Sequence, residues 1–118
     1  MNCFIVGSNL HYTNCSSKKF LGVPFNISSY ALLTYLIAHV CNLQVGEFIH
    51  TFGDLHIYSN HLKQVEEILK RKPLPLPKLE LQNAENLKGL EGLLNFKYEN
   101  LKLENYQSHG KIAAPVAV

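Results

Sequence analysis

The chain has 118 residues, of which 47% are hydrophobic and 17% charged, so we expect one globular domain with a hydrophobic core. The formal net charge is only +2, and the basic residues are scattered apart from the run Lys70-Arg71-Lys72. That run falls where a helix is predicted to end, and cations there are favoured by the helix dipole. We interpret it as a solvated helix end, which argues against a nucleic-acid-binding surface.

The cysteines and the longest apolar segment exclude further classes of protein. The three cysteines are odd in number and show no Cys-x-x-Cys spacing, which argues against a disulfide framework or a zinc site. A reducing, cytoplasmic location fits them best. No positively charged leader precedes an apolar run, and the apolar stretch 30–41 is interrupted by Thr34 and His39. Neither a signal peptide nor a membrane span is therefore expected.

The N-terminal part of the chain predicts two strands and a helix. Residues 3–6 suit a short strand, and a turn at 7–9 would lead into a second strand that ends near residue 15. Asn26 or Ser28 is a candidate N-cap for a helix from about Ser29 to Asn42. This helix is expected to face a core, because its apolar residues recur at helical spacing: Leu33, Leu36, Ile37 and Val40.

A strand and a second helix are predicted next. Residues 47–58 are rich in aromatic and β-branched side chains and predict one long strand, or two with a kink at Gly53-Asp54. Ser59 or Asn60 is expected to cap the helix that follows and that Pro73 ends. One side of that helix is an apolar stripe of Leu62, Val65, Ile68 and Leu69. The other side carries the pairs Glu66/Lys70 and Glu67/Arg71.

The sequence after the second helix predicts extended segments joined by a loop. The stretch PLPLPKLEL must be extended, because each proline fixes φ and biases the residue before it towards extended conformations. A polar loop containing Gly89 and Gly92 follows. The stretch FKYENLKLENY then alternates like an edge strand, and the tail KIAAPVAV is apolar and extended.

The segment GDLHIYSNH, residues 53–61, carries two polar side chains at alternate positions. In a strand, His56 and Tyr58 project from one face and Ile57 from the other, so two donors would lie side by side. Such a pair can hold a ligand hydroxyl, and the alternative is a satisfied, half-buried pair without a ligand. No metal is expected, because His56 and His61 fall on different elements and no carboxylate or thiolate joins them at ligand spacing.

The segment FLGVPFN, residues 20–26, is the second candidate for a binding site. Its glycine allows a ligand to lie close to the backbone in a tight turn at 21–24. Asn26 offers a donor and an acceptor at one point, which suits the edge of a pyrimidine. The alternative is an ordinary turn followed by a helix N-cap at Asn26.

Five segments occur in an order that is not generic: FLGVPFNISSYALLTYLIAHV, VGEFIHTFGDLHIYSNH, PLPKLEL, FKYENLKLENY and APVAV. In their order and in nearly all of their residues, these segments resemble the thymidylate synthase family over residues 20–118. The resemblance implies an α/β (α+β) fold class, namely a partial thymidylate synthase fold with a mixed β-sheet and packed helices. Residues 16–118 would be the C-terminal portion of the domain, and residues 1–15 a divergent segment.

The resemblance also implies a reaction and roles for individual residues. The family methylates dUMP to dTMP with methylenetetrahydrofolate as carbon donor and reductant, and works as an obligate homodimer. By this resemblance Asn26 would bind the pyrimidine edge, His56 and Tyr58 the ribose hydroxyl, and Ser16 the phosphate. Contacts with the folate would come from Leu21, Gly22, Phe25, Val116 and Ala117, with the C-terminus closing over the site as a lid.

The nucleophile of the family reaction is missing from this chain. A cysteine thiolate attacks C6 of the pyrimidine, so that C5 becomes a nucleophile towards the methylene group of the folate. In the family this cysteine has a Pro-Cys-His context, which none of Cys3, Cys15 and Cys41 shares. Cys41 is expected inside an apolar helix, where a thiol is inert packing. The arginines that clamp the phosphate also belong mostly to the part of the family sequence that is missing here, so we expect the chain to be inactive alone.

The segment before FLGVPFN departs from the family. Family members have Leu-Tyr-Gln-Arg-Ser and then an aspartate, whereas here Cys15 takes the arginine position and Lys18 the aspartate position. Lys18 inverts the charge that would face the folate, which makes it a poor replacement. One inserted base would turn codons for the family motif into codons for residues 11–15. Our hypothesis is that residues 1–15 are translated out of frame in the remnant of a broken synthase gene; upstream DNA without a shifted Pro-Cys-His codon run would contradict it.

The sequence leaves three functional interpretations. The first is an inactive synthase fragment that retains contacts with dUMP and the folate. The second is a non-catalytic module that pairs with an intact synthase or weakly binds nucleotide. The third is a chain that does not fold stably, because cutting a mixed sheet leaves apolar faces and strand edges unpaired.

Overall fold

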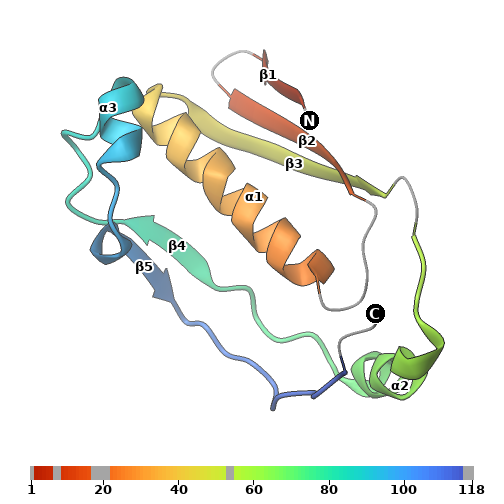
Figure 1. Ribbon diagram of the computed structural model, residues 1–118. Coiled ribbons are helices and arrows are strands. Elements are labelled where there is room, and N and C mark those ends of the chain that lie inside the picture. The colour runs from red at the N-terminus through yellow and green to blue at the C-terminus, as the bar shows by residue number, and fades with distance from the viewer. Residues whose placement is uncertain (1, 7–8, 17–21, 53–54, 116–118) are drawn as a thin grey trace.

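The computed structural model describes residues 2–6, 9–16, 22–52 and 55–115, with side chains described from residue 22 onward (Figure 1). Its elements, in chain order, are β1 (Asn2–Val6), β2 (Asn9–Ser16), α1 (Gly22–Val40), β3 (Gln44–Phe52), a 3-10 turn (Ser59–His61), α2 (Leu62–Lys70), β4 (Lys78–Leu81), α3 (Gly89–Leu94), a 3-10 turn (Tyr98–Asn100) and β5 (Leu101–Glu104). Two sheets flank the long helix α1 in Figure 1.

The larger sheet is mixed and has the order β1-β2-β3. β1 pairs antiparallel with β2, from Asn2 opposite Thr13 to Val6 opposite Asn9. β2 pairs in parallel with β3, and this ladder ends where Ser16 lies opposite Phe52. Parallel neighbours need a crossover connection, which α1 supplies. The two predicted N-terminal strands and the mixed sheet with packed helices are therefore confirmed.

Helix α1 begins at Gly22, well before the predicted start at Ser29. Pro24 fits its first turn, because backbone N–H groups there have no partner within the helix and the ring costs no hydrogen bond. The Ser28 hydroxyl donates to the Pro24 carbonyl one turn back, so a polar residue also fits inside the helix. The predicted tight turn and both predicted caps, Asn26 and Ser28, were wrong, since Gly22 to Pro24 and the two caps all lie within α1.

Helix α1 ends at Val40, close to the predicted end at Asn42. Asn42 adopts a left-handed conformation with φ of 55°, and the Leu43 N–H donates to the Ala38 carbonyl at 2.8 Å. Asparagine tolerates this conformation, which stops the helix and satisfies a terminal carbonyl. Cys41 lies after the helix and is exposed, so the expectation of a thiol packed inside an apolar helix was wrong.

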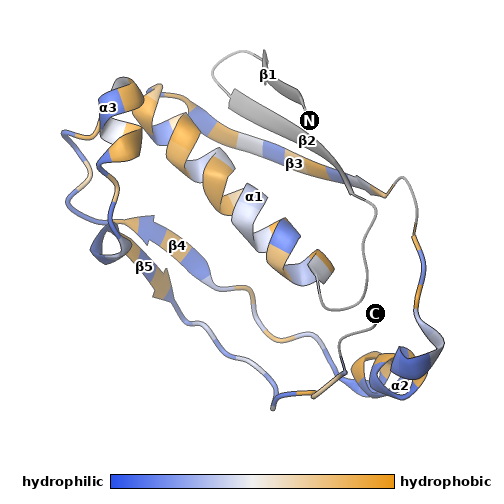
Figure 2. Cartoon of the chain, in the orientation of Figure 1, coloured by the Kyte–Doolittle hydropathy of each residue, from blue (hydrophilic) through white to orange (hydrophobic). Residues whose placement is uncertain are grey.

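Helix α1 packs against β2, β3 and α3, and Thr34, Ala38 and Val40 are buried in it. Hydrophobic residues follow most of its length in Figure 2. By length and composition alone it could cross a membrane, a test that core helices of soluble proteins also pass. Two strands and a helix contact it, and only 17% of its apolar segment is buried.

The segment after β3 differs from the prediction. β3 ends at Phe52, and residues 55–58 have no strand partner, so the strand predicted over residues 47–58 is too long. The predicted kink at residues 53–54 lies outside the described residues. A 3-10 turn precedes α2, whose N-cap is His61 without a side-chain hydrogen bond, so capping by Ser59 or Asn60 was also wrong.

The second sheet is the antiparallel pair β4–β5, with Lys78 opposite Glu104 and Glu80 opposite Lys102. These four charges share one face, because every second residue of a strand points the same way. The pKa of Glu104 lies below its ordinary value, first because Lys102 donates a hydrogen bond to it and then because of the lysine charge. The extended prolyl stretch is confirmed. The strand predicted over FKYENLKLENY is limited to β5, and the predicted polar loop contains α3.

The surface of the chain is large for its length. The accessible area is 8811 Å², against about 6,500 Å² for a folded monomer of this mass. The radius of gyration is 16.7 Å, against about 13–14 Å for a compact domain of this length. Among the described residues, the buried hydrophobic side chains are only Ala38, Val40 and Ala84. Much apolar surface that a complete domain would bury is thus exposed.

Gly92, which is buried in α3, generates a prediction about stability. An added methyl group would lie 2.9 Å from the Leu87 Cα and 3.0 Å from its carbonyl oxygen, where no flexible side chain can yield. We expect Gly92→Ala to lower the free energy of unfolding by about 1–3 kcal/mol, despite the better helix propensity of alanine. Urea unfolding followed by circular dichroism measures this. Gly110→Ala is the control, because nothing lies within 4 Å of its added methyl, and equal stability of both variants would contradict the prediction.

Candidate functional site

The candidate site lies at one end of the molecule, where β3 ends, α1 begins and α2 is located (Figure 1). Among the residues predicted to contact a ligand, Ser16 is the last residue of β2. Its side chain is outside the described part of the chain. Leu21, Val116 and Ala117 also lie outside the described residues. The described candidates are Gly22, Phe25, Asn26, His56 and Tyr58.

His56 and Tyr58 lie together, as the sequence predicted. Their ring centroids are 5.3 Å apart with an interplanar angle of 84°, an edge-to-face arrangement. Both are half-buried, whereas Leu55 and Ile57 are exposed. The alternation therefore persists without a strand partner, because an extended backbone turns successive side chains to opposite sides by itself. Their role in holding a ribose hydroxyl remains a prediction.

His61 continues this cluster towards the C-terminal tail. Its ring centroid lies 5.9 Å from that of Tyr58 at 89°, and the residue is only 1% exposed. Its Nε2 atom is 2.7 Å from the backbone oxygen of Pro115, which can only accept a hydrogen bond, so Nε2 carries the proton. His56, Tyr58, His61 and Pro115 thus form a continuous chain of contacts.

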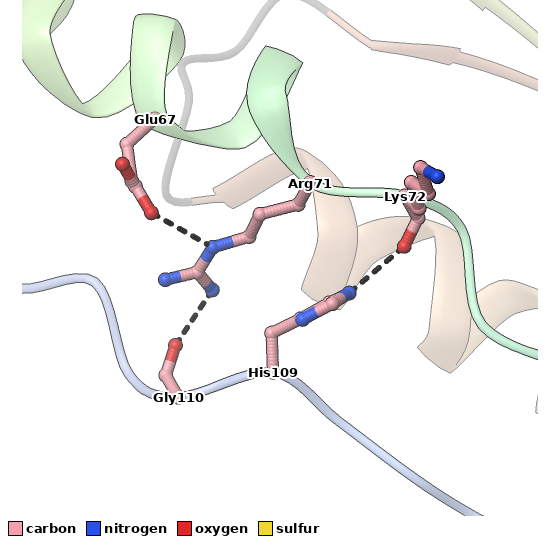
Figure 3. Close-up of polar contacts among 5 residues, drawn as sticks. All are labelled: Glu67, Arg71, Lys72, His109 and Gly110. Carbon is pink, nitrogen blue, oxygen red and sulfur yellow. Dashed lines mark hydrogen bonds and ion pairs between the residues drawn. The ribbon is translucent and has the colours of Figure 1, made fainter.

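The tail is held to α2 and its end at three more points. Gln64 donates to the Ala113 carbonyl at 3.2 Å. Arg71 donates to the Gly110 carbonyl at 2.6 Å and pairs with Glu67 at 3.3 Å, as Figure 3 shows. His109 in return donates from Nε2 to the Lys72 carbonyl at 2.8 Å. We call these three contacts, with His61 to Pro115, the tail clasp.

Sequence reasoning missed most of the tail clasp. The Glu67/Arg71 pair was predicted, but Arg71 was assigned to a solvated helix end, whereas its side chain is 25% exposed and binds the tail. Three of the clasp contacts join residues 39 to 54 positions apart, so no local pattern could reveal them. The only available signal was the tail itself, since a segment without regular structure needs partners for its backbone groups.

The remaining described candidates lie at the beginning of α1. Asn26 and Gly22 are half-buried, and Phe25 is 77% exposed. The contact of Gly22 and Phe25 with a folate stays a prediction. The elements of the predicted site are therefore α1 on one side and the segment before α2 on the other, both at the same end of the molecule (Figure 1).

The other histidines do not form a metal centre in the described residues, where no three of His, Cys, Asp and Glu are grouped. His39 instead has a structural place. Its Nε2 lies 2.7 Å from the Ala84 carbonyl, and its ring packs edge-on against Phe96 at 5.7 Å. These contacts join α1 to the segment around α3.

Comparison with known proteins agrees with the motifs. A sequence model of the thymidylate synthase family matches residues 3–118. The chain is also 54% identical over 103 residues to the thymidylate synthase of Mycoplasma mobile, an alignment that covers 87% of this chain and 34% of the relative. The chain thus spans about a third of the length of that relative. The family match includes residues 3–15, whose out-of-frame origin remains a hypothesis.

Proposed function

The chain belongs to the thymidylate synthase family, and from this we propose that it supplies the ribose-recognition and tail elements of a synthase without catalysing methyl transfer by itself. The observation that carries the proposal is the edge-to-face pair of His56 and Tyr58, which is joined through His61 to the tail. In this proposal the pair binds the ribose hydroxyl of dUMP. A cytoplasmic location suits such a role.

The other nucleotide contacts would come from Asn26 at the pyrimidine edge and Ser16 at the phosphate. Each neutral hydrogen bond contributes about 0.5–1.5 kcal/mol net. The phosphate would lack the bidentate arginine contacts that make charged ligands bind tightly. Because immobilising a ligand costs about 4 kcal/mol or more, we expect a dissociation constant on the order of millimolar.

The folate would bind against the beginning of α1 and the end of the tail. Phe25 and Gly22 suit this contact, since one offers an exposed ring and the other a backbone without a side chain. Leu21, Val116 and Ala117 would complete it. Methylenetetrahydrofolate would bring the one-carbon unit and the reducing electrons. The residues of this chain would only orient it and exclude water.

Catalysis by the chain alone is not proposed, because none of its three cysteines has the Pro-Cys-His neighbours of the family nucleophile. The exposed Cys41 follows the far end of α1, a helix of 19 residues whose length is therefore about 28 Å. A thiolate there could not attack a pyrimidine bound near Asn26, in the first turns of the same helix.

We therefore expect no dTMP from the purified chain supplied with dUMP and methylenetetrahydrofolate. Release of tritium from dUMP labelled at C5 measures the reaction, with the full-length Mycoplasma mobile enzyme as positive control. Release above a buffer blank that disappears on Cys41→Ser would contradict this expectation.

The ribose assignment predicts the effect of Tyr58→Phe. Loss of the hydroxyl should weaken dUMP binding by about two- to twelvefold, the value of one hydrogen bond, and leave binding of 2′,3′-dideoxyuridine monophosphate unchanged. Ligand-observed NMR measures both affinities. The matched control is Tyr98→Phe, because Tyr98 is 85% exposed and lies outside the cluster. Equal loss for both nucleotides would show that Tyr58 does not recognise the ribose hydroxyl.

A second candidate function is pairing with an intact synthase or with another copy of the chain. The excess exposed area favours it, as does an apolar groove of about 580 Å³ between α1 and the β4–β5 pair. Its walls include Leu32, Tyr35, Leu79, Leu101, Leu103 and Tyr106.

Pairing predicts that the chain sediments as a dimer, or as a complex when mixed with a full-length family member. Leu101→Asp in the groove should weaken either association, whereas Lys102→Asp on the charged face of the same strand should not. A wild-type chain that remains monomeric and monodisperse at high micromolar concentration in both samples would exclude pairing.

A further inference from the structure

We propose that two copies of this chain associate by reciprocal exchange: each copy places the apolar side of its α2 into the groove between α1 and the β4–β5 pair of the other. This inference rests on the pairing proposed above as the second candidate function. It identifies the partner as a second copy and the occupant of the groove as α2. Because α2 lies at the other end of the molecule from the β4–β5 pair, it does not fill the groove of its own chain (Figure 1).

The apolar side of α2 is exposed. We call four residues on this side the α2 stripe: Leu62, Val65, Ile68 and Leu69. Leu69 is 79% exposed and Leu62 is 54% exposed. The contacts of α2 with the tail come from other positions, namely Gln64 and Arg71. The polar part of α2 thus has partners within the chain, whereas much of the α2 stripe faces water.

The groove has an apolar character that suits such a helix. Its wall on α1 consists of residues at positions i, i+3, i+4 and i+7: Ser28, Ala31, Leu32 and Tyr35. Leu79 of β4 and Leu103 of β5 contribute to the facing wall. None of the described residues that line the groove is charged. An apolar occupant is therefore favoured, because a charge buried there would have no partner on these walls.

The α2 stripe and the α1 wall of the groove match in length and in spacing. Residues 62–69 and residues 28–35 each span about 10–11 Å along their helices. Both surfaces are one side of an α-helix with residues three and four positions apart, so the side chains of one can lie between those of the other. An amphipathic helix that inserts such a side into an apolar groove is a recurring mode of protein recognition.

The exposed area is sufficient for a stable dimer. The accessible area of the chain exceeds that of a compact monomer of its mass by about 2,300 Å². An interface of standard size covers about 800 Å² on each partner. Reciprocal exchange covers one groove and one α2 stripe on each copy, and it closes by two-fold symmetry, the commonest symmetry of soluble oligomers. A second copy therefore supplies both the surfaces and the area.

The experiment measures the dimer dissociation constant of the full 118-residue chain by sedimentation velocity over a concentration series. Leu69→Asp places a charge on the α2 stripe, and Leu103→Asp places one in the groove. The matched controls are Lys63→Gln on the polar side of α2 and Lys102→Gln on the charged face of β5. They change the net charge by the same amount and leave both contact surfaces intact.

We expect the wild-type chain to dimerise, and each leucine variant to raise the dissociation constant by about tenfold or more, because a buried leucine is lost from each contact. The two lysine controls should keep the wild-type value. A mixture of Leu69→Asp and Leu103→Asp should associate more tightly than either variant alone, because the heterodimer retains one intact stripe in one intact groove. Equal association of the mixture and the separate variants would overturn the exchange.

Other outcomes separate the exchange from pairing in general. A wild-type chain that is monomeric alone but forms a complex with a full-length family member overturns the exchange and leaves the pairing function standing. A chain that is monomeric in both samples overturns both. A dimer that keeps its affinity in both leucine variants but loses it in Ile49→Asp places the contact on the exposed face of β3, where Ile49 is 43% exposed, and overturns the exchange alone.

Circular dichroism of each variant verifies that it folds. Leu69 is exposed enough for its substitution to be tolerated. If Leu103→Asp does not fold, Tyr106→Asp replaces it, because Tyr106 also lines the groove and is 63% exposed. A folded Tyr106→Asp chain with the wild-type dissociation constant would then overturn the exchange.

Discussion

The parallel pairing of β2 and β3 is the constraint on which the rest of the structure depends. Two parallel strands that are neighbours must be joined by a crossover, and α1 is that crossover. Near the end of this helix, His39 lies within hydrogen-bond distance of the Ala84 carbonyl and so attaches the segment before α3. The same helix brings its first turns to the end of the molecule that also contains α2, where the candidate site is assembled (Figure 1).

Exposed apolar surface is a prominent physical property of this chain. Leu62 and Leu69 of the α2 stripe are 54% and 79% exposed, and one side of α1 faces an open groove. Surface of this kind costs free energy in water, at about 25 cal/mol for each Å² left unburied. The chain spans about a third of the length of its relative. The proposal that the chain pairs with a partner draws on this exposed surface.

Near the candidate site, hydrogen bonds hold the C-terminal tail in place. The tail has no regular structure between residues 105 and 115, and four of its residues are attached through hydrogen bonds to α2 and the segments beside it. Three of these bonds end on tail carbonyls, so they depend on the path of the tail more than on its side chains. This arrangement fixes the path of the tail between Gly110 and Pro115.

The sequence by itself determined the family, the class of fold and most of the elements. The spacing of apolar residues predicted α1, and the alternation of polar and apolar residues predicted the strands. The prolines predicted the extended segment before β4. Each of these signals depends only on residues that are close together in the sequence. It also predicted that His56 and Tyr58 lie together, since the period of an extended backbone is local. Only the tertiary structure decided that α1 begins at Gly22, that β3 stops at Phe52 and that Arg71 binds the tail. Those outcomes depend on strand partners and on hydrogen bonds between residues far apart in sequence, and no pattern of neighbouring residues encodes them.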